Sequence, residues 1–336
     1  MIFLPKFSII LPVHNGGEYI KKCVESILSQ TVSDFDLSVL DNNSTDGTLE
    51  WIYSLKDSRI KLYPTQGLLP IEKNWRRIKD IEKNEFITLI GHDDILNRNY
   101  LETMNELIRK HPNASLYQTH FSYIDSSGKE IRKCKPMDEV LSPAEFLSSF
   151  LRNNIDIMGT GFMVRALDYD SFGGIPNYPN LLFADFELWI SIARKGYTAI
   201  SPRECFSFRL HQSMTTSSND IKFQQAFQQF IEFLVTLKQD QRLNEVIEKH
   251  GIEFISFYCK SLSHRLLRTP LQKREYIRVK DFIAGCKEYA DKLVEGNNFK
   301  PQKAFSVGLA NIIDSNPITR KLFILFKKIY SKPIFN

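Results

Sequence analysis

The first 120 residues alternate between short apolar runs and segments with helical spacing, and this alternation constrains the fold more than any other feature of the chain. Apolar, β-branched runs predict four strands, at 7–13, 35–40, 60–63 and 85–90. Helical patterns lie at 18–30, 48–55, 71–81 and 100–109. Strands joined by helices are typical of a mostly parallel, twisted sheet with helices on both faces, so the predicted fold class is α/β.

The middle of the chain is more mixed. A hairpin is predicted at 115–133, strands at 157–165, 197–200 and 205–210, a loop at 166–183 and a helix at 185–195. Ser142, Pro143 and Glu145 form the pattern of a capping box, which opens a predicted helix ending near residue 151.

From residue 219 onward the patterns are helical, and the charge changes with them. Lys and Arg number 20 against 11 Asp and Glu from residue 221 to the end, whereas the preceding residues carry 24 against 28. We therefore expect two domains, 1–218 and a helical, basic region 219–336. The basic excess indicates a phosphate-rich or membrane partner for the second.

Five widely spaced cysteines form no zinc or redox motif, which indicates free thiols in a reducing compartment. No secretory signal pattern opens the chain, and no run of 18 apolar residues predicts a membrane span. A cytoplasmic location is therefore expected.

Polar residues follow the predicted strands at the sheet edge where α/β proteins bind ligands. The segments are 12–15, 41–46 and 91–94, joined by the helix that starts at Asp185. They contain neither GxGxxG nor GxxxxGK[ST], which disfavours a dinucleotide site and a P-loop. Carboxylates and amides instead suit base and ribose recognition, with a divalent cation on a diphosphate.

Four strings in this order resemble the family 2 glycosyltransferases, which have the GT-A fold and use nucleotide-sugar donors. They are SIILPVHNGGEYIKKCVESILSQT followed by LDNNSTDGT, then ITLIGHDD, FADFELWISIARKG and FSFRLHQSMTTS. The resemblance covers about residues 6–218 and implies a GT-A-like sheet with a helical C-terminal extension outside the family pattern.

The resemblance implies that the first two segments hold the nucleotide. The residues concerned are Pro12, Val13, His14, Asn15, Glu18, Asp41, Asn42 and Asn43. Asn42 stands where the family has a base-contacting Asp, and its amide could accept from uracil N3–H or flip and donate to another base. The alternative is that residues 41–43 are only turn residues.

ITLIGHDD resembles the strand that ends in the family's DxD-type metal motif. The resemblance implies that Asp93 and Asp94 hold Mn²⁺ or Mg²⁺ on the donor diphosphate, although Gly91 stands where the family often has an acidic residue. His211 resembles the histidine that closes over the diphosphate or touches the metal. The alternatives are a turn and helix cap at 93–94, and a structural histidine.

FADFELW resembles the helix that supplies the family's catalytic base, which makes Asp185 the general base and leaves an ordinary N-cap as the alternative. Trp189, on the same helix, is expected in the core. Either Arg76 or Arg77 is expected to face the diphosphate, with a solvated helix face as the alternative, and Arg209 is the stronger candidate.

Together these features predict a metal-dependent inverting glycosyltransferase. It would move a sugar from a nucleoside-diphosphate sugar, with UDP as the expected nucleotide, to a hydroxyl of a glycan or lipid-linked glycan. One alternative is a non-catalytic nucleotide-binding or scaffolding subunit. Another is a nucleotidyltransferase. Such an enzyme would need a Gly-rich loop with Arg or Lys just after the first strand, and the segment PVHNGGEYI does not supply one. The basic region matches no nucleic-acid motif, so no nucleic-acid partner is expected.

The C-terminal segment is basic and amphipathic. After Asp314 there is no acidic residue, while five are basic: Arg320, Lys321, Lys327, Lys328 and Lys332. One helical face would carry Ile318, Leu322, Leu325, Phe326 and Ile329. Peripheral contact with an anionic membrane, on its cytoplasmic face, and packing of the apolar face on protein are both open.

Overall fold

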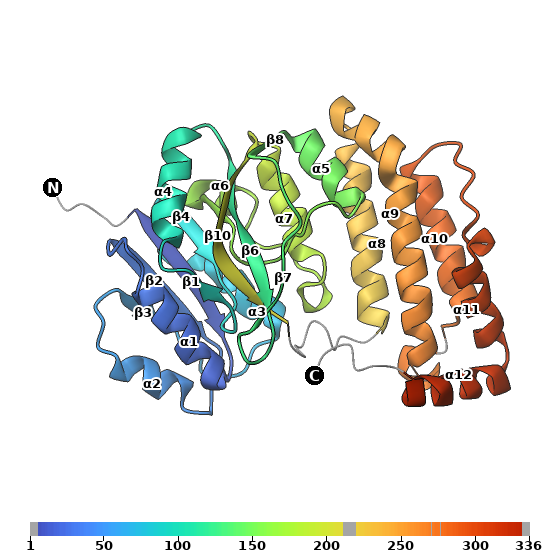
Figure 1. The fold of residues 1–336 in the computed structure, drawn as a ribbon, viewed down its shortest axis with the longest axis horizontal. Coiled ribbons are helices and arrows are strands. Elements are labelled where there is room, and N and C mark those ends of the chain that lie inside the picture. The colour runs from blue at the N-terminus through green and yellow to red at the C-terminus, as the bar shows by residue number, and fades with distance from the viewer. Residues whose placement is uncertain (1–5, 211–219, 270, 276, 331–336) are drawn as a thin grey trace. The chain divides into compact units, whose positions relative to one another are not determined.

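The computed structural model describes residues 6–210, 220–269, 271–275 and 277–330 (Figure 1). The chain divides into two compact units, Met1–Phe146 with Ile155–His211 and Leu147–Asn154 with Gln212–Asn336. The domain boundary predicted between residues 218 and 219 lies outside the described residues.

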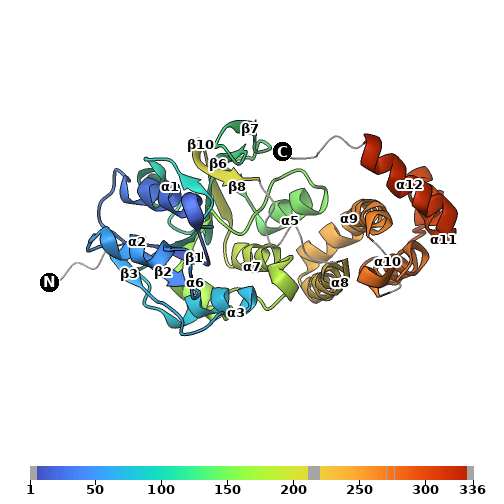
Figure 2. The ribbon, with the colours of Figure 1, turned by 90° about the horizontal axis from the view of Figure 1, so that it is seen from below.

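Four parallel strands begin the first unit close to the predicted positions. They are β1 (Phe7–Val13), β2 (Phe35–Asp41), β3 (Ile60–Leu62) and β4 (Phe86–Leu89), in the order β3-β2-β1-β4. Every residue of β1, β2 and β4 is buried, as expected for parallel strands covered on both faces. Figure 2 shows α1 and α3 on opposite faces of this sheet. The intervening helices are α1 (Gly17–Leu28), α2 (Thr48–Ser54), α3 (Ile71–Arg76) and η1 (Arg77–Asp80).

The other strands extend the sheet in mixed directions. They are β5 (Ile95–Leu96), β6 (Leu116–Ile124), β7 (Glu130–Lys133), β8 (Val140–Leu141), β9 (Met163–Arg165) and β10 (Thr198–Arg209). The full order is β3-β2-β1-β4-β9-β6-β10-β5, with β7 beside β6 and β8 beside β10. Strand β9 is antiparallel to both β4 and β6, so it joins the N-terminal parallel strands to the parallel pair β6–β10.

Some predicted boundaries were wrong. The strand expected at 157–165 is confined to β9, because Gly161 has a left-handed φ of 79° that turns the chain out of the sheet. The two strands expected at 197–210 are one strand, β10, whose register shifts between Ser201 and Phe206. The expected loop at 166–183 contains α6 (Ala166–Ser171) and η2 (Pro179–Leu181).

Further helices follow the predicted pattern: α4 (Tyr100–Lys110), α5 (Pro143–Leu151) and α7 (Ala184–Ala193). The capping box that opens α5 is confirmed. The Glu145 carboxylate accepts the Ser142 N–H at 2.8 Å, and the Ser142 hydroxyl accepts the Glu145 N–H at 3.3 Å. Two donors at the helix start are thereby satisfied.

The second unit is helical, as predicted. Its elements are α8 (Asp220–Leu237), α9 (Gln241–Arg268), η3 (Leu271–Arg274), α10 (Val279–Leu293), η4 (Pro301–Lys303), α11 (Phe305–Ser315) and α12 (Pro317–Tyr330). In the series α8 to α11 each helix runs antiparallel to the one before it, and α12 turns across their end (Figure 1). Phe227, Phe254 and Tyr258 stack in its core at ring-centroid distances of 4.8 to 6.0 Å.

The α/β fold class with a helical C-terminal part is therefore confirmed. Of the helices in the described ranges, none combines the length and the apolar composition that crossing a bilayer requires.

Gly161 provides a test of this backbone path. A Cβ at residue 161 would lie 2.7 Å from the ring of buried Phe206, in addition to the left-handed φ. We expect Gly161→Ala to lower the free energy of unfolding by about 2–4 kcal/mol, measured in urea. Gly173→Ala is the matched control, because φ there is 80° and nothing lies within 4 Å of the added Cβ. The control should lose only about 1–2 kcal/mol, and equal losses would contradict the steric argument.

Candidate active site

The loops after β1 and β2 are tied together side by side. Strand pairing places Pro12 opposite Leu40 and Val13 opposite Asp41. His14 Nδ1 lies 2.9 Å from the main-chain oxygen of Asn42, and Asn15 Oδ1 accepts the Thr45 N–H at 2.8 Å. The structure thus brings together the predicted nucleotide segments 12–15 and 41–43 at the carboxyl end of the sheet.

Asn42 is buried, and the main chain of Leu69 holds its amide. Its Oδ1 accepts the Leu69 N–H at 2.9 Å, and its Nδ2 donates to the Leu69 carbonyl at 2.9 Å. If the amide were flipped, its NH₂ group would face the Leu69 N–H and its oxygen would face the Leu69 carbonyl oxygen. The orientation that the sequence left open is therefore set by Leu69, a residue that sequence reasoning did not single out.

Asp41 is also buried and is supported by Arg77. Its Oδ2 accepts the Ser44 N–H at 3.2 Å, while no described residue donates to its buried Oδ1. Arg77 Nη1 donates to the Asp41 carbonyl at 3.2 Å and to Asn74 at 2.8 Å. Arg77 is thus the arginine of this pair that lies against the nucleotide segments.

Two other predicted residues face solvent. Arg76 is exposed. Glu18 has 82% of its side chain exposed and pairs with Lys21 at 2.8 Å. His211 lies outside the described residues.

The Asp94 carboxylate joins three distant segments. It is 1% exposed. Its Oδ2 accepts the Thr160 hydroxyl at 2.8 Å, and its Oδ1 accepts the Arg209 N–H at 2.9 Å. Burial and then the negative charge of Asp93 raise the pKa of Asp94 well above its usual range. Thr160 was missed from the sequence, although the string Gly-Thr-Gly, a hydroxyl between two glycines, could have indicated it.

Gly91 leaves room for the carboxylate of Asp93. A Cβ at residue 91 would lie 2.7 Å from Asp93 Oδ1 and 3.1 Å from Asp94 Oδ2. The Asp93 side chain therefore occupies the space into which a side chain at 91 would point. Sterically, this explains why position 91, where the family often has an acidic residue, is a glycine in this chain.

Arg209 is buried beside the acidic pair and binds main-chain oxygens. Its Nε donates to the Asp93 carbonyl at 2.8 Å, and Nη1 donates to the Asp125 carbonyl at 2.7 Å. The guanidinium lies 4.7 Å from the centre of the Tyr19 ring. Among the described residues, none accepts a hydrogen bond from its Nη2. That group can serve an anion brought to the site.

Asp185 lies in the first turn of α7, against residues 158–162. Its Oδ1 accepts the Phe186 N–H at 3.0 Å, and its Oδ2 lies toward Gly159. Burial raises the pKa of Asp185 to about 7. Trp189 donates to the Met158 carbonyl at 2.9 Å and is 1% exposed, which confirms it as a core residue. The segment 158–162 therefore contacts both Asp185 and, through Thr160, Asp94.

The chain before α7 is strained. Asn180, Leu181 and Phe183 all have left-handed φ angles, of 53°, 57° and 66°. The Asn180 N–H donates to Glu72 at 2.6 Å, and the Tyr178 hydroxyl donates to Glu187. Non-glycine residues in this region cost free energy and are concentrated at functional sites.

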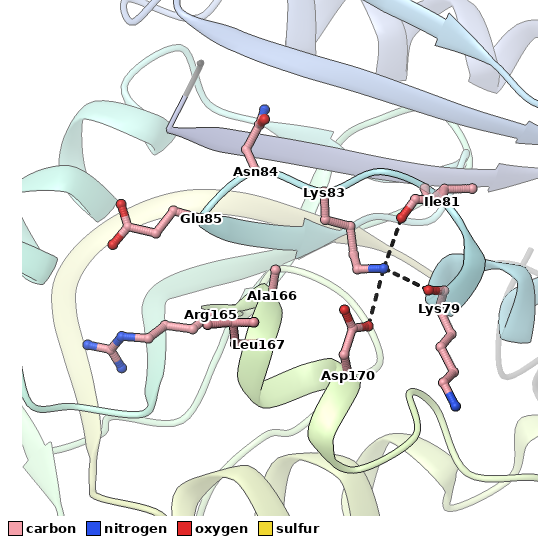
Figure 3. Close-up of a pocket in the computed structure, with 9 residues that line it drawn as sticks. All are labelled: Lys79, Ile81, Lys83, Asn84, Glu85, Arg165, Ala166, Leu167 and Asp170. Atoms are coloured by element: carbon pink, nitrogen blue, oxygen red, sulfur yellow. Dashed lines mark hydrogen bonds and ion pairs between the residues drawn. The ribbon is translucent and has the colours of Figure 1, made fainter. Parts of the chain in front are cut away.

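A pocket of about 490 Å³ lies at the other end of β4 (Figure 3). Its Lys83 ammonium is 3.2 Å from Asp170 and donates to the carbonyls of Lys79 and Ile81 at 2.9 and 3.0 Å. Since Lys83 is only 5% exposed and already paired, the pocket's main buried cation has a structural role. The predicted site residues lie elsewhere.

The acidic pair suits a hard divalent cation in its chemistry. Asp93 and Asp94 supply carboxylate oxygens of the kind that Mg²⁺ and Mn²⁺ bind. No group of three or more His, Cys, Asp and Glu side chains among the described residues could hold a metal without further ligands. A cation on Asp93 and Asp94 would therefore need further ligands, and His211, a candidate for this role, lies outside the described residues.

Comparison with known proteins gives one family. Residues 8–168, just under half of the chain, match Glycosyl transferase family 2. The glycosyltransferase GlyG of Streptococcus pneumoniae is 26% identical over 123 residues, which are 36% of this chain and 41% of GlyG. The chain thus aligns with less than half the length of that relative.

Two further similarities extend over more of the chain. The Escherichia coli protein WfgD, a UDP-Glc:alpha-D-GlcNAc-diphosphoundecaprenol beta-1,3-glucosyltransferase, is 27% identical over 217 residues, covering 64% of this chain and 81% of WfgD. Residues 1–349 of TarS from S. aureus, solved with UDP-GlcNAc, superpose with a TM-score of 0.66 at 17% identity. That match covers 98% of this chain and 95% of the TarS chain. The TarS likeness supports the GT-A-type fold.

The Asn42 contact with Leu69 can be tested by one charge change. In Asn42→Asp a buried carboxylate would face the Leu69 carbonyl oxygen, which raises its pKa. We expect a loss of about 2–3 kcal/mol in the free energy of unfolding at neutral pH. The loss should shrink as the pH falls through the raised pKa, because the protonated acid can donate to that carbonyl. Asn43→Asp is the control, since Asn43 is half-buried and Asp tolerates its φ of 57°. A pH-independent loss in Asn42→Asp would contradict the assignment.

Proposed function

Since residues 8–168 match Glycosyl transferase family 2, we propose that the protein is a family 2 glycosyltransferase, a metal-dependent inverting enzyme of glycan synthesis. The observation that carries the proposal is the placement of Asp185. A carboxyl group with a pKa of about 7 shares the segment 158–162 with the buried Asp94 of the acidic pair. An acid–base group and a diphosphate site are thereby held on one rigid support.

The proposed donor is a nucleoside-diphosphate sugar, with UDP as the nucleotide. It would lie on the segments Pro12–Asn15 and Asp41–Asn43. Leu69 uses one Nδ2 hydrogen and one Oδ1 lone pair of Asn42. The second lone pair of Oδ1 can accept the N3–H of uracil. WfgD is named for UDP-Glc and TarS was solved with UDP-GlcNAc, which supports UDP by analogy.

The proposed metal is Mn²⁺ or Mg²⁺, held by Asp93 and Asp94, with His211 as a further candidate ligand. A bound divalent cation supplies positive charge to the departing diphosphate. Asp93 is the more accessible of the two carboxylates, since Asp94 is 1% exposed and accepts a hydrogen bond on each oxygen. Nη2 of Arg209, which no described residue engages, can donate to a phosphate oxygen. Arg76 stays a candidate for the same phosphates.

The proposed role of Asp185 is general base. Its Oδ1 is engaged by the Phe186 N–H, which leaves Oδ2 to take the proton from the acceptor hydroxyl. The hydroxyl oxygen then attacks the anomeric carbon in one displacement, the bond to the diphosphate breaks, and the configuration inverts. A pKa of about 7 is near the optimum for a base at neutral pH.

The proposed acceptor is a glycan or a lipid-linked glycan. The proposed location is the cytoplasm, with peripheral contact between the basic C-terminal helix and the cytoplasmic face of a membrane. A screen of nucleotide release over a panel of nucleotide sugars, with Mn²⁺ or Mg²⁺ and without acceptor, tests the donor. Release from no donor would favour a non-catalytic binding subunit.

Asp185→Asn tests the base. The amide keeps the shape and accepts the Phe186 N–H, but it cannot take a proton. Transfer should fall by roughly 10²–10⁴-fold while the donor affinity changes little. For the unmodified protein, kcat/KM should rise with pH through about 7 and then level, and this rise should vanish in the variant. Glu187→Gln is the control on the same helix, because Tyr178 already engages that carboxylate.

The same variant has a predicted effect on stability. The folded pKa of Asp185 is raised, so its contribution to folding is complete at low pH and is lost as the pH rises from about 4 to about 7. Asp185→Asn should therefore be at least as stable as the unmodified protein at pH values above 7, measured by thermal unfolding. A normal transfer rate in a folded variant would make Asp185 only a helix cap.

Asp93→Asn and Asp94→Asn test the acidic pair. Both should lower turnover by at least about 10²-fold, since the metal supports the leaving group. Asp94→Asn should keep the fold, because its amide oxygen can accept the Arg209 N–H while its NH₂ donates to the Thr160 hydroxyl oxygen. Calorimetry of UDP binding with and without Mn²⁺ measures the loss of metal-dependent affinity, and exposed Asp80→Asn is the control. Full activity in excess chelator would contradict the metal.

A further inference from the structure

Helices α11 and α12 each expose a line of large apolar side chains. On α11 these are Phe305, Leu309 and Ile312, which are 84%, 41% and 64% exposed. On α12 they are Ile318, Leu322, Leu325 and Phe326, which are 48% to 69% exposed. The spacings i, i+4, i+7 place each set on one helical face. Apolar faces of this kind mark interaction sites.

The side of α12 that turns inward carries the buried Arg320, beside the half-buried Phe323, Ile324 and Lys327. Arg320 is 8% exposed, its Nη2 donates to the Thr269 carbonyl, and its Nε lies 3.7 Å from Asp314 Oδ1. Asp314 is 2% exposed and also accepts from Arg274 and from the Val279 N–H. The helix is therefore anchored by buried charge and presents one line of large apolar residues outward, whereas an ordinary surface helix turns such a line inward.

The segment that forms these faces is strongly basic. Between residues 296 and 336 the sequence contains seven Lys and Arg, and its only acidic residue is the buried Asp314. Lys303 and Lys321 are exposed, and Lys327 is half-buried. The lines on α11 and α12 thus combine exposed apolar side chains with uncompensated cations.

We propose that the outer faces of α11 and α12, here called the apolar-basic face, dock on an anionic lipid bilayer. The helices would lie in the plane of the interface, with the apolar side chains among the acyl chains and the lysines at the lipid phosphates. With 14 residues, α12 is shorter than the roughly 20 that a span requires. This inference does not depend on the identity of the donor.

Charge favours a bilayer over a second copy of the chain. Two apolar-basic faces in contact would bring the exposed Lys321 of both copies close together, and α11 and α12 expose no acidic residue that could balance them. An anionic bilayer supplies an acyl-chain region for the exposed apolar side chains and negative charge for the lysines. From the sequence, the apolar face of the C-terminal helix could contact either a membrane or protein. The outward position of the apolar side chains and the addition of the α11 line favour the membrane.

The test is sedimentation of the full chain with vesicles. Vesicles of phosphatidylglycerol mixed with phosphatidylcholine are compared with pure phosphatidylcholine, at low and high salt. The unmodified protein should bind the mixed vesicles at least about 10-fold more tightly than the neutral ones, and less tightly at high salt. Leu322→Ser with Leu325→Ser should weaken binding at least about 10-fold. Phe305→Ser with Ile312→Ser should also weaken binding to the mixed vesicles.

Matched controls are Val235→Ser and Phe257→Ser, exposed apolar residues on α8 and α9 of the same unit. They should bind as the unmodified protein does. Lys303→Glu with Lys321→Glu, both at exposed positions, tests the charge without altering the apolar lines, and it should abolish the preference for anionic vesicles. These surface changes keep the test usable if a serine variant fails to fold. Nucleotide release in solution should be retained by all of them, so a failed donor screen and failed vesicle binding are distinguishable.

Three outcomes would overturn the proposal. The first is that the unmodified protein does not sediment with anionic vesicles at low salt. The second is that the serine and glutamate variants bind as the unmodified protein does. The third, measured by light scattering, is a dimer that the α12 serine variant converts to monomers while neither binds vesicles, which would make this face an interface between copies.

Discussion

The candidate site depends on one buried carboxylate. Asp94 is 1% exposed, and a carboxylate removed from water costs several kcal/mol unless donors surround it. The donors are the Thr160 hydroxyl and the Arg209 N–H, which lie 66 and 115 positions along the chain. Satisfying this one group therefore fixes the loop after β4, the approach to β9 and the end of β10 in a single arrangement.

That arrangement determines where the proposed base lies. The segment 158–162 is fastened by Trp189 at the Met158 carbonyl, by Thr160 at Asp94, and by the Gly161 N–H at the Leu89 carbonyl. Phe162 stacks on Trp189 with ring centroids 4.8 Å apart. Because α7 packs on this segment, Asp185 is held by core contacts instead of a free loop. Such support is what a preorganised acid–base group requires.

The sequence predicted those features that local chemistry determines. The bounds of β1 followed from an unbroken apolar run, and the start of α5 followed from Ser142 and Glu145. Long-range pairings have no local pattern, so the contact of Asn42 with Leu69 and the choice of Arg77 over Arg76 were not predictable. The strand predicted at 157–165 was started too early, because the glycine at 161 marks a close approach to Phe206 and gives no turn signal in the sequence.

The orientation of the C-terminal helix α12 was likewise not predictable from the sequence, and it too depends on a buried carboxylate. Its periodicity separated an apolar face from a basic face, but periodicity does not say which face turns inward. Burial of Asp314 decides this, because a second carboxylate out of water needs cationic partners, and Arg274 and Arg320 supply them. Once Arg320 is drawn inward, the helix must present Leu322 and Leu325 outward, 60% and 48% exposed. In each unit, one buried carboxylate therefore fixes how distant segments meet: Asp94 does so in the first unit and Asp314 in the second.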